Sequence, residues 1–142
     1  MKIFIDTNVL LDVLRNRQPF AKESVSIWSL AESEKMEGYV SAISFNNVYY
    51  ILRRTSDGNT ADNAMRIMRD TFRIIPLDER ILNKAIDSNF NDFEDAIQFF
   101  SAIHADVDHI ITRNVKDFSR QDISALTPEA FLALDFDRSA LS

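Results

Sequence analysis

Short runs of β-favouring apolar residues alternate with longer segments of helical periodicity along this chain, and this alternation restricts its fold more than any other feature. The first run, "KIFI" at residues 2–5, has no polar alternation, as expected of a central strand that is buried on both faces. No hairpin signal joins two of the runs, so helices must connect them. We therefore predict an α/β fold, a three-layer α/β/α sandwich with a central parallel sheet of four to five strands.

The predicted elements follow one another through short connections. Strands are predicted at residues 2–5, 39–42, 73–77 and 109–112, with an edge strand early in 123–134. Helices are predicted at residues 7–16, 19–36, 43–54, 61–72, 78–88 and 93–105, and a last helix starts at Pro128 after Thr127 as its N-cap. Residues 56–59 and 113–118 are predicted to form polar turns. The other predicted N-caps are Ser44, Thr60, and either Asn91 or Asp92.

One globular domain over residues 1–142 is expected, because 46% of the residues are hydrophobic and a chain of this length can bury a sizeable core. There is no apolar run approaching the roughly 20 residues of a membrane span, and no basic segment followed by a cleavable apolar stretch. The chain has no cysteine, which excludes disulfides and thiolate metal sites and agrees with a cytoplasmic protein. The net charge of −6 disfavours a surface broadly coated by nucleic acid, but it is compatible with a local basic rim.

Polar residues follow three of the four main predicted strands. Asp6 ends the first strand, residues 41–44 follow the second, and residues 112–114 follow the fourth. The carboxyl ends of parallel strands lie at one edge of the sheet, where such proteins form their binding sites. We therefore expect these polar residues to gather at that edge.

Four carboxylates are candidates for a site there: Asp6, Glu94, Asp95 and Asp117. An acid directly after a buried strand is costly unless something compensates it, although Asp6 could simply cap the next helix. Glu94 and Asp95 lie in the first turn of a predicted helix, where acids also favour the helix dipole. If the strand ends converge, the carboxylates repel one another, and their pKa values rise unless a cation occupies the site.

The chemistry of this set favours a divalent metal ion. Oxygen ligands without histidine or cysteine suit Mg²⁺ or Mn²⁺. Such an ion supplies an activated water and stabilises charge on a phosphate, so no histidine base is required. His104 and His109 are accordingly interpreted as a helix-surface residue and a strand-start residue.

Four motifs occur in a fixed order along the chain: "IFIDTNVLLDVL", "YVSAISFNNVYYIL", "DFEDAIQFFSA" and "HIITRNVKDF". Together with "LTPEAFL" they resemble PIN-domain proteins, and most of all the bacterial branch of VapC-type toxin nucleases with a "DFEDA" helix. The resemblance implies a parallel sheet between helices and a metal-dependent ribonuclease with an acidic pocket. By this resemblance Asp6 is the first acid, Asp95 is the helix acid with Glu94 as an extra one, and Asn114 or Asp117 is the acid near the fourth strand.

The chain departs from the family pattern at two places. Asn46 and Asn47 stand where most of the family has a glutamate, and Asn114 stands where an aspartate is common. An amide can bind Mg²⁺ through its oxygen or hold a water on the ion, but it adds no charge. We therefore expect weak activity or activity that strongly favours Mn²⁺.

Further polar residues are expected around the acids. Asn8, Ser44, Asn47, Thr112 and Asn114 are candidates for holding the ligands or contacting a phosphate, and as an equal alternative they are caps and turn residues. Arg113, with neighbouring basic residues, could contact RNA phosphates. Asp12 lies about one and two-thirds helical turns after Asp6 and is predicted to be a solvated surface residue.

Two functional hypotheses follow. The first is an Mg²⁺/Mn²⁺-dependent endoribonuclease in which Asp6, Glu94 and Asp95 bind the metal and Asp117 completes the pocket, leaving a 5′-phosphate as the resemblance implies. The alternative is a catalytically weakened PIN fold that serves as an RNA- or protein-binding module. The resemblance also implies RNA as substrate, an antitoxin protein as partner and a homodimer. Four aromatic residues could line such interfaces, although core burial is expected for most of them: Tyr49, Tyr50, Phe99 and Phe100.

Overall fold

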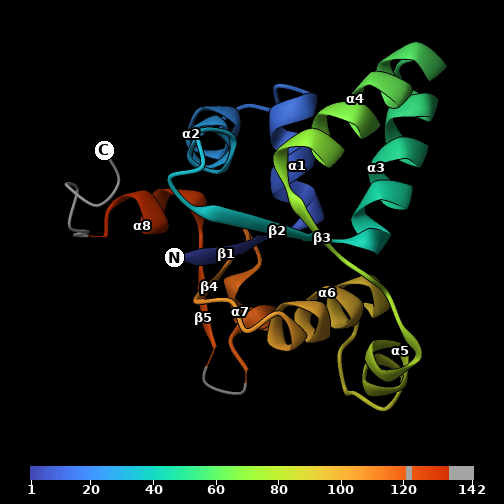
Figure 1. Ribbon diagram of the computed structural model, residues 1–142, viewed down its shortest axis with the longest axis vertical. Helices are drawn as coiled ribbons and strands as arrows, with labels where there is room; N and C mark the ends of the chain where they lie inside the picture. Colours follow the sequence, from blue (N-terminus) through green and yellow to red (C-terminus); the bar gives the residue numbers. More distant parts are fainter. Residues whose placement is uncertain (121–122, 135–142) are drawn as a thin grey trace.

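A computed structural model describes residues 1–120 and 123–134, and within them the chain forms a five-stranded sheet in which all paired strands are parallel. The strand order is β3-β2-β1-β4-β5, which places β1 at the centre (Figure 1). The strands are β1 (Lys2–Ile5), β2 (Glu37–Ser41), β3 (Arg73–Ile75), β4 (His109–Ile111) and β5 (Ser124–Leu126). The predicted α/β fold with a parallel sheet is confirmed.

Helices cover both faces of this sheet, as the predicted three-layer sandwich requires (Figure 1). One layer contains α1 (Thr7–Leu14), α2 (Ala21–Glu32), α3 (Ala42–Thr55), α4 (Gly58–Thr71) and α8 (Pro128–Leu132). The other layer contains α5 (Glu79–Ile86), α6 (Phe93–His104) and α7 (Val115–Phe118).

Strand β1 explains why two cores form. Successive side chains of a strand point to opposite faces, so Ile3 and Ile5 pack into the core under α1 while Phe4 packs into the core under α6. All three side chains are at most 1% exposed. Burying each stabilises the fold by about 1.5–3 kcal/mol, which is why residues 3–5 are all apolar.

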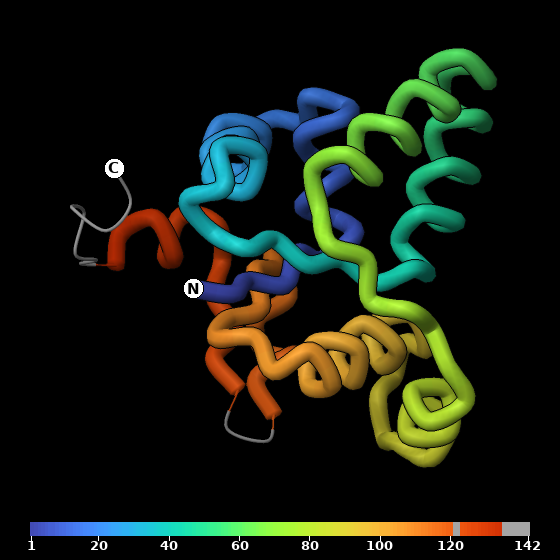
Figure 2. The backbone as a smooth tube through the Cα atoms, viewed as in Figure 1, coloured from blue at the N-terminus to red at the C-terminus, as the bar shows by residue number. Residues whose placement is uncertain are grey.

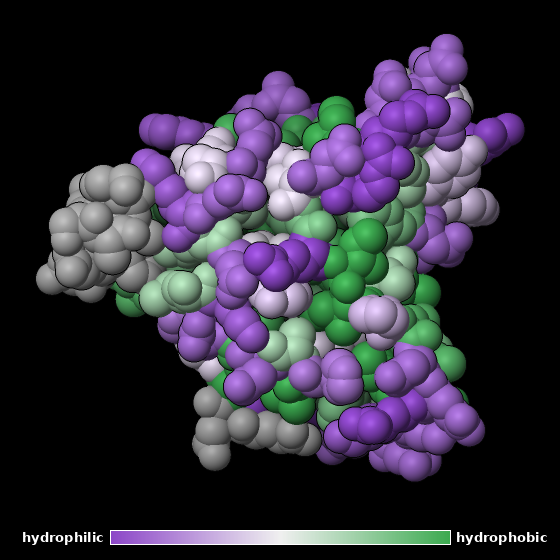
Figure 3. All heavy atoms as spheres, viewed as in Figure 1, coloured by the Kyte–Doolittle hydropathy of each residue, from purple (hydrophilic) through white to green (hydrophobic). Residues whose placement is uncertain are grey.

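The central strands also bring distant segments together. Figure 2 shows the amino-terminal segment beside the segment near residue 110, and the register pairs Phe4 with Ile110. On the face drawn in Figure 3, hydrophilic side chains cover α4 and α5, and hydrophobic ones show in the band between the layers. The edge strand β3 leaves Ile74 44% exposed there. Within residues 1–120 and 123–134, no helix is both long and apolar enough to cross a membrane.

Several predicted element boundaries were wrong. Ser41, at the junction of β2 and α3, caps α3 by accepting a hydrogen bond from the Ile43 amide, whereas the predicted cap Ser44 is buried one turn later. Asp57, and not Thr60, caps α4. Residues 113–118 contain the short helix α7 where a turn was predicted.

Other caps agree with the sequence. Asp92 caps α6, and Thr127 caps α8 with Pro128 as the first helical residue. His109 begins β4 as predicted, and its Nδ1 lies 2.8 Å from the hydroxyl of Ser124.

The prediction for Asp12 was wrong, because its side chain is fully buried. Two arginines neutralise it there: Arg17 Nε lies 2.8 Å from Oδ1, and Arg113 Nε lies 2.9 Å from Oδ2. The helical-turn argument placed Asp12 correctly away from Asp6, but it could not show that α2 and the segment after β4 cover that side of α1. Asp12 therefore joins α1 to the segment that follows β4.

Candidate functional site

Asp6 occupies the point where β1 passes into α1. Its backbone amide donates to the Ile111 carbonyl, so the ends of the two central strands lie side by side. Asp6 is the N-cap residue of α1 and its side chain is 2% exposed; the carboxylate makes no side-chain capping hydrogen bond, although the backbone amide of Asn8 lowers its pKa. Instead Oδ2 accepts from the Thr112 hydroxyl at 2.8 Å and Oδ1 accepts from the Gln98 amide at 3.0 Å. Burial raises the pKa of Asp6, and these hydrogen bonds oppose that rise.

Gln98 is the site residue that the sequence interpretation missed. Its side chain is fully buried in α6, and besides donating to Asp6 it accepts from both the amide and the hydroxyl of Thr7. Gln98 lies one turn after Glu94, so the two share a helix face. A single amide at that spacing within the apolar run "AIQFF" was the signal that could have found it.

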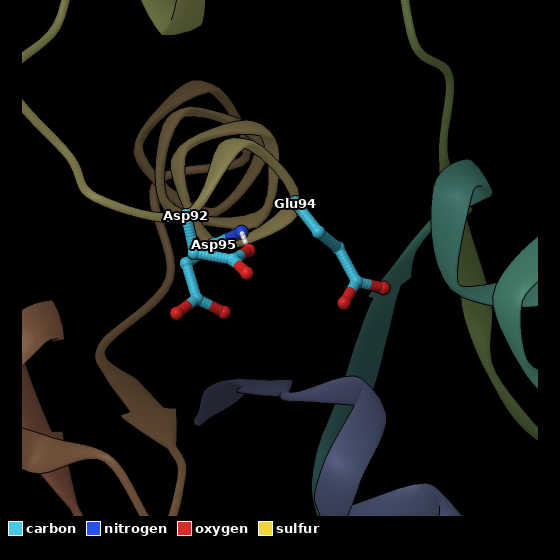
Figure 4. Close-up of side chains that lie close together, drawn as sticks. All are labelled: Asp92, Glu94 and Asp95. Atoms are coloured by element: carbon cyan, nitrogen blue, oxygen red, sulfur yellow. Dashed lines mark hydrogen bonds between the residues drawn. The ribbon is translucent and has the colours of Figure 1, made fainter.

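The first turn of α6 carries an acidic cluster. One carboxylate oxygen from each of Asp92, Glu94 and Asp95 lies within 4.8 Å of the other two. Figure 4 shows the carboxylates of Glu94 and Asp95 extending from this turn into the space that faces the β1–α1 junction, while Asp92 hydrogen-bonds the Asp95 amide. Asp92 was predicted only as a cap, so the structure adds it as a candidate ligand.

The acids act on one another electrostatically. Burial, followed by the nearby charges of Asp6, Asp92, Glu94 and Asp117, raises the pKa of Asp95 to about 7. Burial and the charges of Asp6 and Asp92 also raise the pKa of Glu94, against hydrogen bonds from Asn47 and Thr7. Asp6, Glu94 and Asp117 therefore all lie within electrostatic reach of Asp95.

Asn47 and Asn114 each contact acids of the cluster. Asn47 Nδ2 donates to Glu94 Oε2, which also accepts from the Thr7 hydroxyl at 3.2 Å. Asn114 Nδ2 donates to Asp117 Oδ2 at 2.6 Å and, more weakly, to Asp95 Oδ2 at 3.5 Å. Each asparagine thus orients a carboxylate through a hydrogen bond and adds no negative charge.

Hydroxyl groups complete the network beneath the acids. Ser44 Oγ lies 2.7 Å from the Thr7 hydroxyl, and both side chains are buried. The Thr112 hydroxyl accepts a hydrogen bond from the backbone amide of Asn114 at 2.9 Å while it donates to the Asp6 carboxylate. Ser44 and Thr112 therefore belong to the network, as expected.

Two residues predicted to belong to the site, Asn8 and Arg113, lie at the border of the hydrogen-bond network. Asn8 is exposed at the start of α1, in a groove that Glu94 also lines. Arg113 is held by Asp12, and its guanidinium carbon lies 4.0 Å from the centre of the Phe20 ring. The structure therefore assigns Arg113 a packing contact, whereas an RNA contact remains a prediction.

The donor set fits a divalent cation. The facing groups are the carboxylate oxygens of Asp92, Glu94 and Asp95, and carboxylate oxygens are ligands that Mg²⁺ and Mn²⁺ prefer. Burial raises the pKa values of Asp6, Glu94 and Asp95, and for Glu94 and Asp95 the negative charge of neighbouring acids adds to the rise. A bound dication would offset that charge.

Comparisons with known proteins agree with this arrangement. Residues 2–116 match the family described as PIN domain. The chain is 31% identical over 135 residues to ribonuclease VapC1 of Aquifex aeolicus, which covers 92% of each chain.

Solved structures show the same fold. The VapC20 toxin of Mycobacterium tuberculosis, described as cleaving the sarcin-ricin loop, aligns with a TM-score of 0.69 and 16% identity over 85% of this chain and 95% of that one. A toxin-antitoxin complex from Klebsiella pneumoniae aligns with a TM-score of 0.65 and 24% identity over 89% and 97% of the two chains.

Proposed function

Because the chain belongs to the PIN-domain family, we propose that it is a metal-dependent endoribonuclease that acts as the toxin of a toxin–antitoxin pair. The observation that carries this proposal is the convergence of Asp6, Glu94, Asp95 and Asp117 at the carboxyl edge of the sheet. The similarity to a ribonuclease over nearly the whole chain supports it. An antitoxin partner is proposed because several neighbours in fold were solved as toxin-antitoxin complexes. A homodimer and a cytoplasmic location belong to the same proposal.

In the proposed mechanism Asp6, Glu94 and Asp95 hold a Mg²⁺ or Mn²⁺ ion, with Asp117 beside them. When bound, such an ion activates water and stabilises the charge that develops on the phosphate. The chain itself supplies orientation: Gln98 and Thr112 hold Asp6, while Asn47 and Thr7 hold Glu94.

Burial and the neighbouring acids raise the pKa of Asp95 to about 7, so this carboxyl group would have to give up its proton to hold a cation near neutral pH. Asn114 joins Asp95 to Asp117 and keeps the two carboxylates in one arrangement. Hydrolysis of an RNA phosphodiester at this site is proposed to leave a 5′-phosphate.

Substituting Asp6→Asn tests the proposal. The change keeps the size of the side chain but removes its charge and replaces one of the two acceptor oxygens by a donor. Metal-dependent cleavage of RNA should therefore fall further than the roughly 10- to 100-fold typical of residues that only orient a ligand. The matched control is Asp62→Asn at an exposed position of α4, which should cleave as the wild type does. An Asp6→Asn protein with full metal-dependent activity would sink the assignment.

A second candidate function is supported by Asn47 and Asn114, which occupy places where the family commonly has acids. In that case the fold is a catalytically weakened module that binds RNA or protein. Calorimetric titration with Mn²⁺ separates the two: saturable binding that Asp6→Asn abolishes supports the nuclease, and absence of binding near neutral pH supports the module.

A further inference from the structure

A groove of about 470 Å³ lies beside the acidic network, between α1 and α3. Thr7, Asn47 and Glu94 line the groove and also belong to the hydrogen-bond network of the acids. Whatever occupies the groove therefore lies directly against the proposed metal centre. The proposed metal chemistry leaves the rest of the groove unused.

Tyr50 gives the groove an exposed aromatic wall. Its side chain is 59% exposed, whereas Val48 and Leu52 on the inner side of the same helix are buried. The guanidinium carbon of Arg54 lies 5.5 Å from the centre of the Tyr50 ring, one turn further along α3. This contact restricts the ring while leaving it accessible from the groove.

Asn46 adds a polar group on the same side of α3. It is exposed, lines the groove, and precedes Tyr50 by four residues, so the two side chains are neighbours about 6 Å apart along the helix axis. Its carboxamide offers both a donor and an acceptor. The groove thus combines an aromatic face with one hydrogen-bonding edge.

Electrostatics restrict what can bind here. Among the described residues that line the groove, none is lysine or arginine, and Glu94 is acidic. Beyond the lining, Arg54 contacts the Tyr50 ring and Arg17 donates to the Asn8 carbonyl, so neutralisation of phosphates here depends on two neighbouring arginines and not on the groove itself. Stacking of a base on an aromatic ring needs no positive charge and accepts any base.

We propose that this groove holds one unpaired base of the RNA strand beside the phosphodiester that is cleaved, with the base stacked on Tyr50 and its edge hydrogen-bonded by Asn46. This inference rests on the proposed ribonuclease function and adds a substrate subsite to it. It makes the protein select single-stranded or looped RNA, because the bases of a duplex are already paired and stacked.

The test uses the full chain and an oligoribonucleotide that carries 2-aminopurine, offered as a single strand and as a duplex. Binding is measured in EDTA, where no metal supports cleavage, and the kinetic constants KM and kcat are measured with Mn²⁺. Tyr50→Ala should weaken single-strand binding roughly tenfold, raise KM with little change in kcat, and abolish the quenching of 2-aminopurine fluorescence. Tyr50→Phe should retain all three properties, and Asn46→Ala should reduce the preference among bases.

Ile86→Ala is the control, since Ile86 is 63% exposed on α5 and has no part in the groove. The subsite is overturned if Tyr50→Ala binds the single strand as tightly as the wild type does. It is also overturned if the wild type binds single strand and duplex with equal affinity, or does not bind the probe at all. If Asp6-dependent cleavage persists with an unchanged KM in Tyr50→Ala, the subsite fails and the proposed function stands. If Tyr50-dependent binding occurs without any Asp6-dependent cleavage, the subsite stands and the proposed function fails.

Discussion

The carboxyl group of Asp95 shows the conflict between stability and function at a single residue. Its pKa is raised to about 7, chiefly by burial and then by the charges of Asp6, Asp92, Glu94 and Asp117. Since the pKa in the unfolded chain is near 3.8, the folded protein binds more protons between these two values. Folding stability contributed by this group therefore falls as pH rises from about 4 to 7 and is constant above that. The raised pKa values of Asp6 and Glu94 act in the same direction.

Asp95→Asn should consequently stabilise the metal-free protein near pH 7.5 while removing a proposed metal ligand. We expect a gain of about 1–2 kcal/mol, less than the full pKa shift implies because the carboxyl group is only half-buried and screened by water. Thermal unfolding in EDTA from pH 4.5 to 7.5 measures this. As the pH rises, the wild-type Tm should fall, and the Tm of the variant should fall less. Asp62→Asn, on the surface of α4, should follow the wild type. A Tm of Asp95→Asn at or below that of the wild type at pH 7.5 contradicts this account.

Helix α1 is held at both ends by polar contacts that orient the site. At its start, the amide and hydroxyl of Thr7 donate to Gln98 of α6. Near its end, buried Asp12 contacts Arg113, which directly follows the Thr112 that binds Asp6. The charge of Arg113 also opposes the raised pKa of Asp6. The strand-end geometry therefore depends on an ion pair outside the acidic cluster.

Asp12→Ala should destabilise the protein by about 2–4 kcal/mol, because it removes the buried partner of two arginines that are about one-third exposed. In denaturant unfolding, the double variant Asp12→Ala/Arg113→Met should lose less stability than the sum of its single variants, with a coupling of about 0.5–3 kcal/mol. The control is Asp70→Ala, whose ion pair with Arg69 is exposed on both sides and contributes about 0–1 kcal/mol. Additive effects, or a loss no larger than that of Asp70→Ala, would argue against the pair as an organising contact.

On the scale of the whole molecule, the site joins segments that are far apart in the sequence. The contacts of Asp6 with Gln98 and Thr112 span 92 and 106 positions, and the contact of Asn47 with Glu94 spans 47. An ion held by Asp6 and the α6 acids would link the centre of the sheet to one helical layer. Such binding stabilises only the folded state, since the unfolded chain does not bring these acids together.

Divalent ions should therefore raise the Tm, and Mn²⁺ should do so more than Mg²⁺ because Asn47 and Asn114 contribute uncharged amides beside the acids. An ion at about one hundred times its dissociation constant contributes about 2.7 kcal/mol. Calorimetric scans with each ion, against sodium chloride at matched ionic strength, should show a shift that Asp6→Asn loses, and RNA cleavage should follow the same order of metals. Equal Tm shifts and full cleavage activity with Mg²⁺ would overturn the preference for Mn²⁺.

Much of the fold could be predicted from local sequence patterns. The periodicities placed the helices and strands, and the absence of hairpin signals indicated the parallel sheet that the structure has. The rule that parallel strands end at one edge placed Asp6 beside Thr112, whereas the acids of α6 follow no strand and were not placed by this rule. Caps were less predictable, because Ser41 and Ser44 are both plausible caps until the strand end is known.

The sequence by itself determined the order of the elements and the central buried strand, because these follow from periodicity, and residue chemistry together with the family resemblance supplied the candidate acids. The tertiary structure alone decided which polar side chains are buried and what they contact: Asp12 lies under arginines from two other segments, and Gln98 lies between Asp6 and Thr7. Tyr50 stays exposed while Phe99, equally aromatic, is fully buried. Burial depends on neighbours contributed by distant parts of the chain, and no local pattern contains them.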